Sequence, residues 1–349
     1  MRKSVALALF ALAGCSKDSP PPAETETPSV APPHAEAAPP AAPSASASGD
    51  SAAPSPPASA SAASTTSSSP TSTPPSTVRL LDPGRAPRRA LRYAWRPEQK
   101  EQMAIVLSTI VSADSPNGHQ DVRLPPLHVA IAIDPQGTSP EGDLAYGWRV
   151  TSAGADDDAG APADVAQGWR AQIVPLEHLS GRGVVSSRGL TRGVTLDQVA
   201  GDAGAGGEMV VQVLQMLRDA AAPLPEEPVG KGARWQKMSS IDAKNSHASE
   251  TDTFTLTDLQ GDKGSLDDMV AQTTSSQALP TLVGVDASQS PPARMDSLLM
   301  SGSSKTRFDL TRLIPQTSLD ATTSMALSAS TNRVNMVMRI NIAIQGSTR

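Results

Sequence analysis

The chain has 349 residues, 38% of them hydrophobic and only 3% aromatic, and its formal net charge at pH 7 is -6. Since the pI is near 5.4, the chain lacks the basic surface that nucleic-acid-binding proteins direct at phosphates, and this class of function is excluded. With so few aromatic residues, the core must be built from Val, Ile, Leu, Ala and Met, and a single cysteine leaves no internal disulfide to support it.

The N-terminus has the pattern of a bacterial secretory signal. Two basic residues follow Met1, residues 5–11 are apolar, and small residues precede Cys15. The apolar run is too short to cross a bilayer as a helix. Within this pattern, Leu12-Ala13-Gly14-Cys15 resembles the lipobox of bacterial lipoproteins. The alternative is an ordinary secretory signal in which Cys15 is only a small apolar residue.

The lipobox resemblance implies how the chain is processed and where it resides. Residues 1–14 would be the signal peptide, and Cys15 would be the lipidation site, with diacylglycerol on its thiol and an acyl chain on its new amino group. Two or more acyl chains give stable membrane anchoring. Ser16 follows the cysteine in place of an aspartate, which favours the outer membrane over the inner one. We therefore expect a lipid-anchored protein of the cell envelope.

Residues 15–77 are predicted to be a disordered tether that begins with the lipidated cysteine. They consist almost entirely of Pro, Ala, Ser and Thr, with no periodic apolar positions. Such a segment cannot bury enough surface to offset the entropy cost of ordering it. A flexible coil of about 60 residues spans roughly 40 Å. The tether either lifts the following domain off the membrane or is a permissive spacer.

Residues 78–349 are predicted to form one mainly β domain, because apolar residues recur with period two. Near the C-terminus, Met336, Met338 and Ile340 alternate with polar residues, so one face of this strand is apolar and the other is polar. Strands are predicted over residues 91–95, 103–111, 127–133, 146–152, 169–176, 183–188, 233–241, 251–259, 294–301, 306–313, 322–328 and 334–344.

One segment, residues 207–222, has helical periodicity instead. Val210, Val213, Leu214 and Leu217 lie at positions i, i+3, i+4 and i+7, which predicts one amphipathic α-helix that Pro223 helps to end. This helix either covers the apolar face of the sheet or acts as a gate over a ligand cavity. Residues 154–166 are predicted to be a solvated loop.

A short motif follows the predicted helix. The segment Pro228-Val229-Gly230-Lys231-Gly232-Ala233-Arg234-Trp235 resembles a family of functionally uncharacterised bacterial lipoproteins, whose members also have an opening strand like residues 91–95 and an element like Phe308-Asp309-Leu310. The family has no known activity that the resemblance could imply. We expect Gly230 and Gly232 to supply a positive φ or a close backbone approach, and Trp235 to begin a strand.

A long antiparallel sheet with one apolar face and a lone helix also resembles the open half-barrel of periplasmic lipoprotein carriers. This likeness implies a large curved sheet, an open or half barrel, whose concave face holds an acyl chain. Thioether side chains adapt to irregular apolar partners. The predicted lining for an apolar ligand is Met103, Leu107, Met336, Met338 and Ile340. The alternative is that the helix and facing strands fill this surface as an ordinary core.

The sequence contains no recognisable catalytic pattern. It lacks the Gly-x-Ser-x-Gly, Ser-x-x-Lys, P-loop, His-Glu-x-x-His and Cys-x-x-Cys motifs. Adjacent Asp267 and Asp268 would point to opposite faces of a strand and so cannot form a carboxylate pair. The histidines that follow the tether are far apart, and each is more simply a polar residue than a metal ligand: His119, His128, His178 and His247. We expect no enzyme, no cofactor and no metal.

Six arginines stand at the start of the domain: Arg79, Arg85, Arg88, Arg89, Arg92 and Arg96. They either contact anionic lipid headgroups or keep this end of the domain solvated. The expected partners are the membrane, through the lipid anchor, and a lipid-like ligand or an envelope protein. The sequence therefore predicts an apolar-ligand-binding envelope protein, with a structural or protein-interaction module as the alternative.

Overall fold

The computed structural model describes residues 76–115, 118–156, 161–197, 207–243, 246–274, 277–278, 294–329 and 332–348. All of these residues belong to one compact unit. The predicted signal peptide, Cys15 and nearly all of the predicted tether lie outside the described residues.

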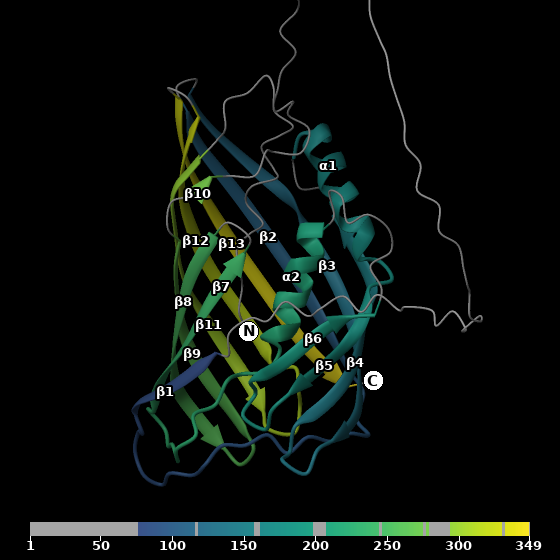
Figure 1. Cartoon of the computed structure of the whole chain (residues 1–349), viewed down its shortest axis with the longest axis vertical. Helices are drawn as coiled ribbons and strands as arrows, with labels where there is room; N and C mark the ends of the chain where they lie inside the picture. The colour runs from purple at the N-terminus through teal and green to yellow at the C-terminus, as the bar shows by residue number, and fades with distance from the viewer. Residues whose placement is uncertain are drawn as a thin grey trace, which may run out of the picture. The chain divides into compact units, whose positions relative to one another are not determined.

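The described residues form one large antiparallel sheet (Figure 1). Its strands lie in the order β1-β7-β8-β9-β11-β12-β13-β2-β3-β4-β5-β6, and the short β10 pairs with β11 off this path. The strands are β1 (Thr77–Asp82), β2 (Glu101–Ser115), β3 (Gly118–Thr138), β4 (Leu144–Ala155), β5 (Ser180–Val185), β6 (Thr191–Leu196), β7 (Arg234–Ala243), β8 (Ser246–Gln260), β9 (Lys263–Thr274), β10 (Gln277–Ala278), β11 (Arg294–Asp309), β12 (Gln316–Ala329) and β13 (Asn332–Thr348).

The sheet is curved and not closed, as predicted. Strands β1 and β6 are its two edges, because each pairs with only one neighbouring strand and the two do not pair with each other. The last strand of the chain, β13, pairs with β2 and so lies in the middle of the sheet rather than at an edge. Figure 1 shows the sheet curling around the two helices. The mainly β fold with a large open antiparallel sheet is confirmed.

Two helices lie on the concave side, where one was predicted. The expected amphipathic helix is α2 (Gly207–Arg218), which ends before the predicted boundary at residue 222. The second, α1 (Ala163–Ile173), continues into a 3-10 turn (Val174–Leu176), so the strand predicted over residues 169–176 is wrong. Trp169, Ile173 and Leu176 are buried at positions i, i+4 and i+7, which is a helical spacing. The loop predicted over residues 154–166 is likewise helical from Ala163 onward.

The predicted opening strand over residues 91–95 is an extended segment outside the ladder. Its burial does alternate, since Leu91, Tyr93 and Trp95 are buried. However, Tyr93 N–H donates to the Ser187 carbonyl oxygen and Ala94 N–H donates to that of Leu310. The two N–H groups bond to segments far apart in the chain, so no single neighbouring strand pairs with this segment.

Other observed strand boundaries differ from the predicted ones, because polar stretches interrupt the apolar alternation from which the strands were predicted. Strand β11 unites the strand predicted over residues 294–301 with the first part of the one predicted over residues 306–313, and it ends at Asp309, so residues 310–313 are not a strand. The polar stretch Ser303-Ser304-Lys305 between them contains one buried residue, Ser304, and so continues the alternation. Strands β1, β6, β9 and the short β10 were not predicted.

The glycine motif has the predicted structural roles. Gly232 has a φ of +85°, a conformation that L side chains rarely adopt. At Gly230 the reason is a close approach, because a Cβ atom there would lie 1.9 Å from the carbonyl oxygen of Arg85. Trp235 follows in β7, fully buried, and its Nε1 donates to the Pro223 carbonyl oxygen at 2.9 Å. These expectations are confirmed.

Candidate ligand-binding face

All five residues predicted to line a ligand lie on one face of the sheet, here called the inner face. Met336, Met338 and Ile340 alternate along β13, and Met103 and Leu107 lie on β2. Each is at most 5% exposed. Met103 pairs with Gly346, about 20 Å along β13 from Ile340 at 3.3 Å per residue. The five residues therefore form a strip along two paired strands and not a single compact spot.

The structure adds two methionines to this strip. Met325 of β12 lies directly opposite Met336, and Met300 of β11 is separated from Met338 only by Thr323. Met300, Met325, Met336 and Met338, hereafter the methionine patch, are all buried on the inner face. The sequence analysis missed Met300 and Met325, because only the pairing of β11, β12 and β13 brings them to the patch.

A row of paired residues crosses five strands of the inner face from a polar end to an apolar end. It runs from β8 to β13 through Glu250, Gln272, Met300, Thr323 and Met338. At 4.8 Å per strand, these residues span about 19 Å. All five are buried. This inner row therefore joins a buried carboxylate to the methionine patch.

Buried polar atoms without a hydrogen-bond partner among the described residues lie on the inner row and on the row beside it. Within the described part of the chain, Gln272 Oε1, Thr323 Oγ1 and Thr109 Oγ1 are buried without a hydrogen-bond partner. Thr109 lies opposite Ile340, on the row next to the methionine patch. Buried polar atoms in native proteins are almost always paired, so unpaired ones call for a water, an ion or a ligand. Here three of them share one face of the sheet.

Charged side chains are buried beside the polar end of this row. Asp252 and Asp268 lie on the inner face of β8 and β9, and the Lys237 side chain of β7 lies opposite Asp252. Lys237 Nζ donates to Oδ1 of Asp219, just beyond α2, at 3.0 Å. Asp267, the neighbour of Asp268, is exposed on the other face, as predicted. The inner face is thus acidic across β8 and β9.

The helices contact strands in the other half of the sheet, although the segment just after α2 reaches β7 through the Asp219–Lys237 pair. Helix α1 contacts β3 and β4, and α2 contacts β6. The buried face of α2 carries Met209, Val213 and Leu217, and Tyr146 of β4 donates to the Leu217 carbonyl oxygen at 3.4 Å. These contacts agree with a helix that covers the apolar face.

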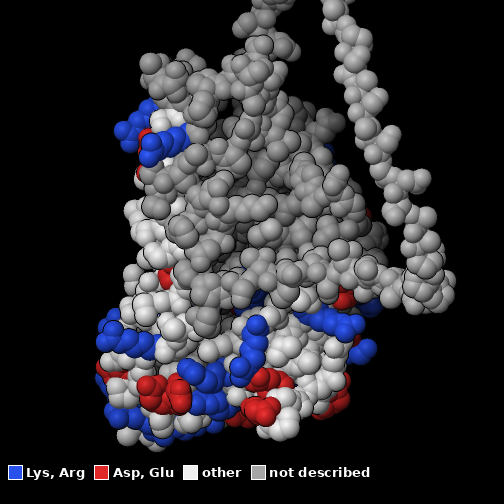
Figure 2. Space-filling model, viewed as in Figure 1, with Lys and Arg blue, Asp and Glu red and all other residues white. Residues whose placement is uncertain are grey.

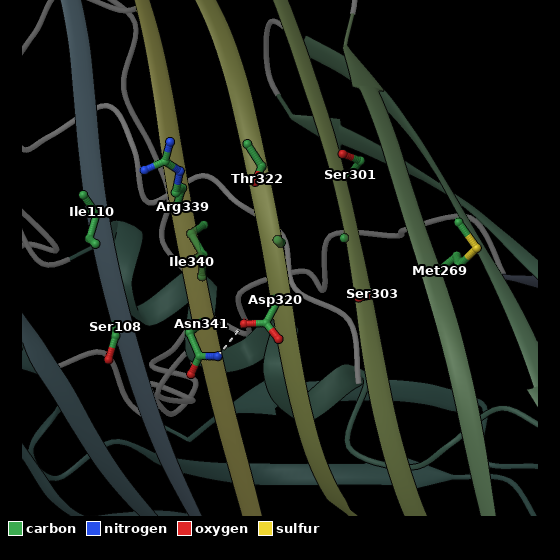
Figure 3. A pocket seen from close by; sticks show the side chains of 12 residues that line it. Ser108, Ile110, Met269, Ser301, Ser303, Asp320, Thr322, Arg339, Ile340 and Asn341 are labelled. Carbon is green, nitrogen blue, oxygen red and sulfur yellow. Dashed lines mark hydrogen bonds between the residues drawn. The ribbon is translucent and has the colours of Figure 1, made fainter.

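A pocket of about 560 Å³ lies on the outer face (Figure 3). Across it, Asn341 Nδ2 donates to Asp320 Oδ1 at 2.7 Å. Ile340 also borders this pocket, although its side chain is buried. Much of the lining consists of short polar side chains from neighbouring strands: Ser108, Ser301, Ser303, Asp320, Thr322 and Asn341. The pocket is a shallow trough where these side chains are small.

Two of the six arginines at the start of the domain bind other loops through hydrogen bonds and an ion pair. Arg92 donates to the carbonyl oxygens of Pro225 and Glu226, at 3.1 and 2.8 Å. Arg89 donates to the Gly261 carbonyl oxygen and lies 3.6 Å from Asp262. Figure 2 shows Lys and Arg intermixed with Asp and Glu at the lower end of the view. Arg89 and Arg92 are therefore engaged in contacts within the fold, and the charged side chains visible in this view are of mixed sign.

Two of the predicted polar histidines, His119 and His128, have separate acidic partners. His119 lies at the β2–β3 hairpin, with its Nδ1 2.7 Å from Asp114 Oδ1 and its Nε2 3.3 Å from Asp121 Oδ1. Its hydrogen bond to Asp114, and then that to Asp121, raise its pKa. His128 pairs separately with Asp156, at 3.1 Å. Among the described residues, no three His, Cys, Asp or Glu side chains are grouped to hold a metal ion.

No helix within the described ranges is both long enough and apolar enough to traverse a membrane. The resemblances to bacterial lipoproteins rest on the residues quoted above. Comparison of the chain with protein-family models, with curated proteins and with solved structures finds no match.

Proposed function

We propose that this protein is a lipid-anchored component of the bacterial cell envelope whose inner face binds a lipid-like molecule. The lipobox-like sequence ending at Cys15 supports the anchor. The curved open sheet supports the binding role, because such a sheet presents one long apolar face. The role is binding and not catalysis.

The observation that carries the proposal is the composition of the inner row. Thioether side chains adapt to irregular apolar partners, and the methionine patch places four of them together. Thr323 lies inside this patch with a buried hydroxyl that has no described partner. A molecule bound against this face would meet the hydroxyl and could supply the partner that it lacks.

A second candidate function is docking of an envelope protein on the outer face. Met238, Met269 and Leu299 are 44%, 70% and 55% exposed there, on β7, β9 and β11. These three apolar side chains lie on one face of the sheet, in different rows, and exposed apolar patches mark interaction surfaces. This alternative needs no ligand on the inner face.

Mass spectrometry of organic extracts tests the first proposal. The full chain carrying Cys15→Ser, which removes the proposed acylation, is purified from a bacterial periplasm without detergent. We expect about one lipid per protein in the extract. Met338→Glu should remove this lipid, because it places a charge in the methionine patch, while Asn335→Glu on the exposed face of the same strand should not. A folded protein that yields no lipid would favour the docking function.

A further inference from the structure

We propose that the molecule bound by the inner face is a cationic amphiphile, whose ammonium head lies against β8 and β9 and whose apolar chain lies along the methionine patch. This inference rests on the proposed function. It specifies the ligand's head, which the apolar residues alone leave open.

The polar end of the inner row is rich in acceptors and carboxylates. Glu250, Asp252 and Asp268 are buried on the inner face of two adjacent strands. With Asp219, four buried carboxyl groups stand against one buried amine, that of Lys237, among the described residues of this region. The fold itself engages all five side chains, so they are held in place before any ligand arrives. A buried region with this excess of carboxylates favours a positive charge over a negative one.

An independent observation points to a ligand at the same place. Gln272 is 7% exposed and lies directly opposite Glu250 on the inner face. Its Oε1 has no hydrogen-bond partner among the described residues. An amide oxygen only accepts hydrogen bonds, so the missing partner is a donor. An ammonium group supplies the donor that Gln272 lacks, and its positive charge suits a region rich in buried carboxyl groups.

The spacing of these groups suits an organic cation. Glu250 and Asp252 are two residues apart on one strand, about 7 Å along the strand. Asp268 lies opposite Phe254, a further two residues along. A calcium ion draws all its oxygen ligands to about 2.3–2.6 Å, which strand positions so far apart do not provide. An ammonium needs only two or three acceptors, and the remaining carboxylates act through their charge.

The inner row also sets the direction in which the apolar chain of the ligand would run. Gln272 pairs with Met300, which is followed across the sheet by Thr323 and Met338. A head at Gln272 therefore places the first part of an attached chain on the methionine patch. About 15 Å of the row, three strand spacings, remains for that chain.

Three ligands with the same ten-carbon apolar chain and different head groups test this inference. The full chain carrying Cys15→Ser is titrated below the micelle concentrations with decylammonium, decanol and decanoate, and binding is followed by calorimetry. We expect decylammonium to bind at least tenfold more tightly than decanol, and decanoate to bind most weakly. Equal binding of the three would overturn the inference while keeping the proposed function. Failure of all three to bind would overturn both.

Two matched substitutions locate the head. Asp268→Asn removes a buried carboxylate, and Asp267→Asn removes its exposed neighbour on the same strand. Asp268→Asn should reduce the preference for decylammonium over decanol several-fold, with decanol binding retained. Asp267→Asn should leave the preference unchanged. Gln272→Leu, which needs no change of charge, should also reduce the preference. A preference that survives both Asp268→Asn and Gln272→Leu would overturn the placement of the head.

Discussion

The hydroxyl of Tyr93 and the main chain of Ala222 exchange two hydrogen bonds. Tyr93 donates to the Ala222 carbonyl oxygen at 3.1 Å and accepts from the Ala222 N–H at 3.0 Å. The Tyr93 ring also stacks on Trp95, with ring centroids 4.3 Å apart. This contact links the extended segment before β2 to the segment after α2, which are also joined by an isolated antiparallel bridge between Arg89 and Val229.

We expect Tyr93→Phe to lower the free energy of unfolding by about 1–3 kcal/mol, because it leaves two buried backbone groups without this partner. Urea unfolding monitored by tryptophan fluorescence measures the change. Tyr146→Phe is the control, since it removes a single longer bond, that to the Leu217 carbonyl oxygen at 3.4 Å. Equal losses for the two variants would contradict the role of the paired bonds. Burial raises the pKa of both phenols, so both stay neutral near pH 7.

Substitutions at the two glycines of the motif should lower stability by different amounts. Gly232→Ala should cost about 1–2 kcal/mol, because the residue has a positive φ but open space around it. Gly230→Ala should cost more, since the new methyl group would overlap the Arg85 carbonyl oxygen and force the backbone apart. Gly193→Ala is the control, because a Cβ there meets nothing within 4 Å and its φ is not positive. Thermal unfolding of the three variants checks this order.

The Asp219–Lys237 ion pair is buried, with side chains only 4% and 8% exposed. Lys237→Met should lower the free energy of unfolding by about 3–5 kcal/mol, because Asp219 then loses its ammonium partner in a buried setting. The double variant with Asp219→Leu should recover much of this loss. Lys305→Met on the exposed face of β11 should change stability little. A double variant no more stable than Lys237→Met would show that the pair is not the cause.

His119 makes the hairpin between β2 and β3 sensitive to pH. Its pKa is raised above the ordinary 6.5, chiefly by the hydrogen bond to Asp114. A raised folded-state pKa means that the protonated histidine stabilises the fold, so its contribution is full below pH 6.5 and is lost as the pH rises through the folded pKa. NMR titration of the His119 ring should give a value above 6.5 that falls in Asp114→Asn. An unchanged value in Asp114→Asn would contradict the pairing.

Period-two alternation was enough to predict most of the sheet. Along β13, Met336, Met338 and Ile340 are buried while Asn335 and Arg339 are exposed, as the sequence indicates. The pattern is local, since successive side chains of a strand point to opposite faces. The same local logic was wrong for residues 169–176, because a short apolar run containing Trp169 and Ile173 fits a strand and a helix almost equally well.

The polar half of the inner face was not predicted at all. Glu250, Asp252 and Gln272 sit in sequences that look solvent-exposed, and no apolar pattern marks them as buried. Pairing of β8 with β9, and of β9 with β11, places Gln272 between Glu250 and Met300. The one available signal was the strict alternation of Thr251, Thr253 and Thr255 with the residues between them, which assigns Asp252 and Phe254 to one face.

The sequence by itself determined the mainly β class, the helix at α2, the roles of Gly230 and Gly232 and the apolar face of β13, because each depends on residues close together in the chain. Only the tertiary structure decided which strands are neighbours, and so which side chains share a row. The methionine patch brings together residues between 300 and 338. The buried carboxyl groups at the polar end of the inner face come from residues between Asp219 and Asp268. Strand pairing depends on packing across the whole sheet, which no single segment of the sequence encodes.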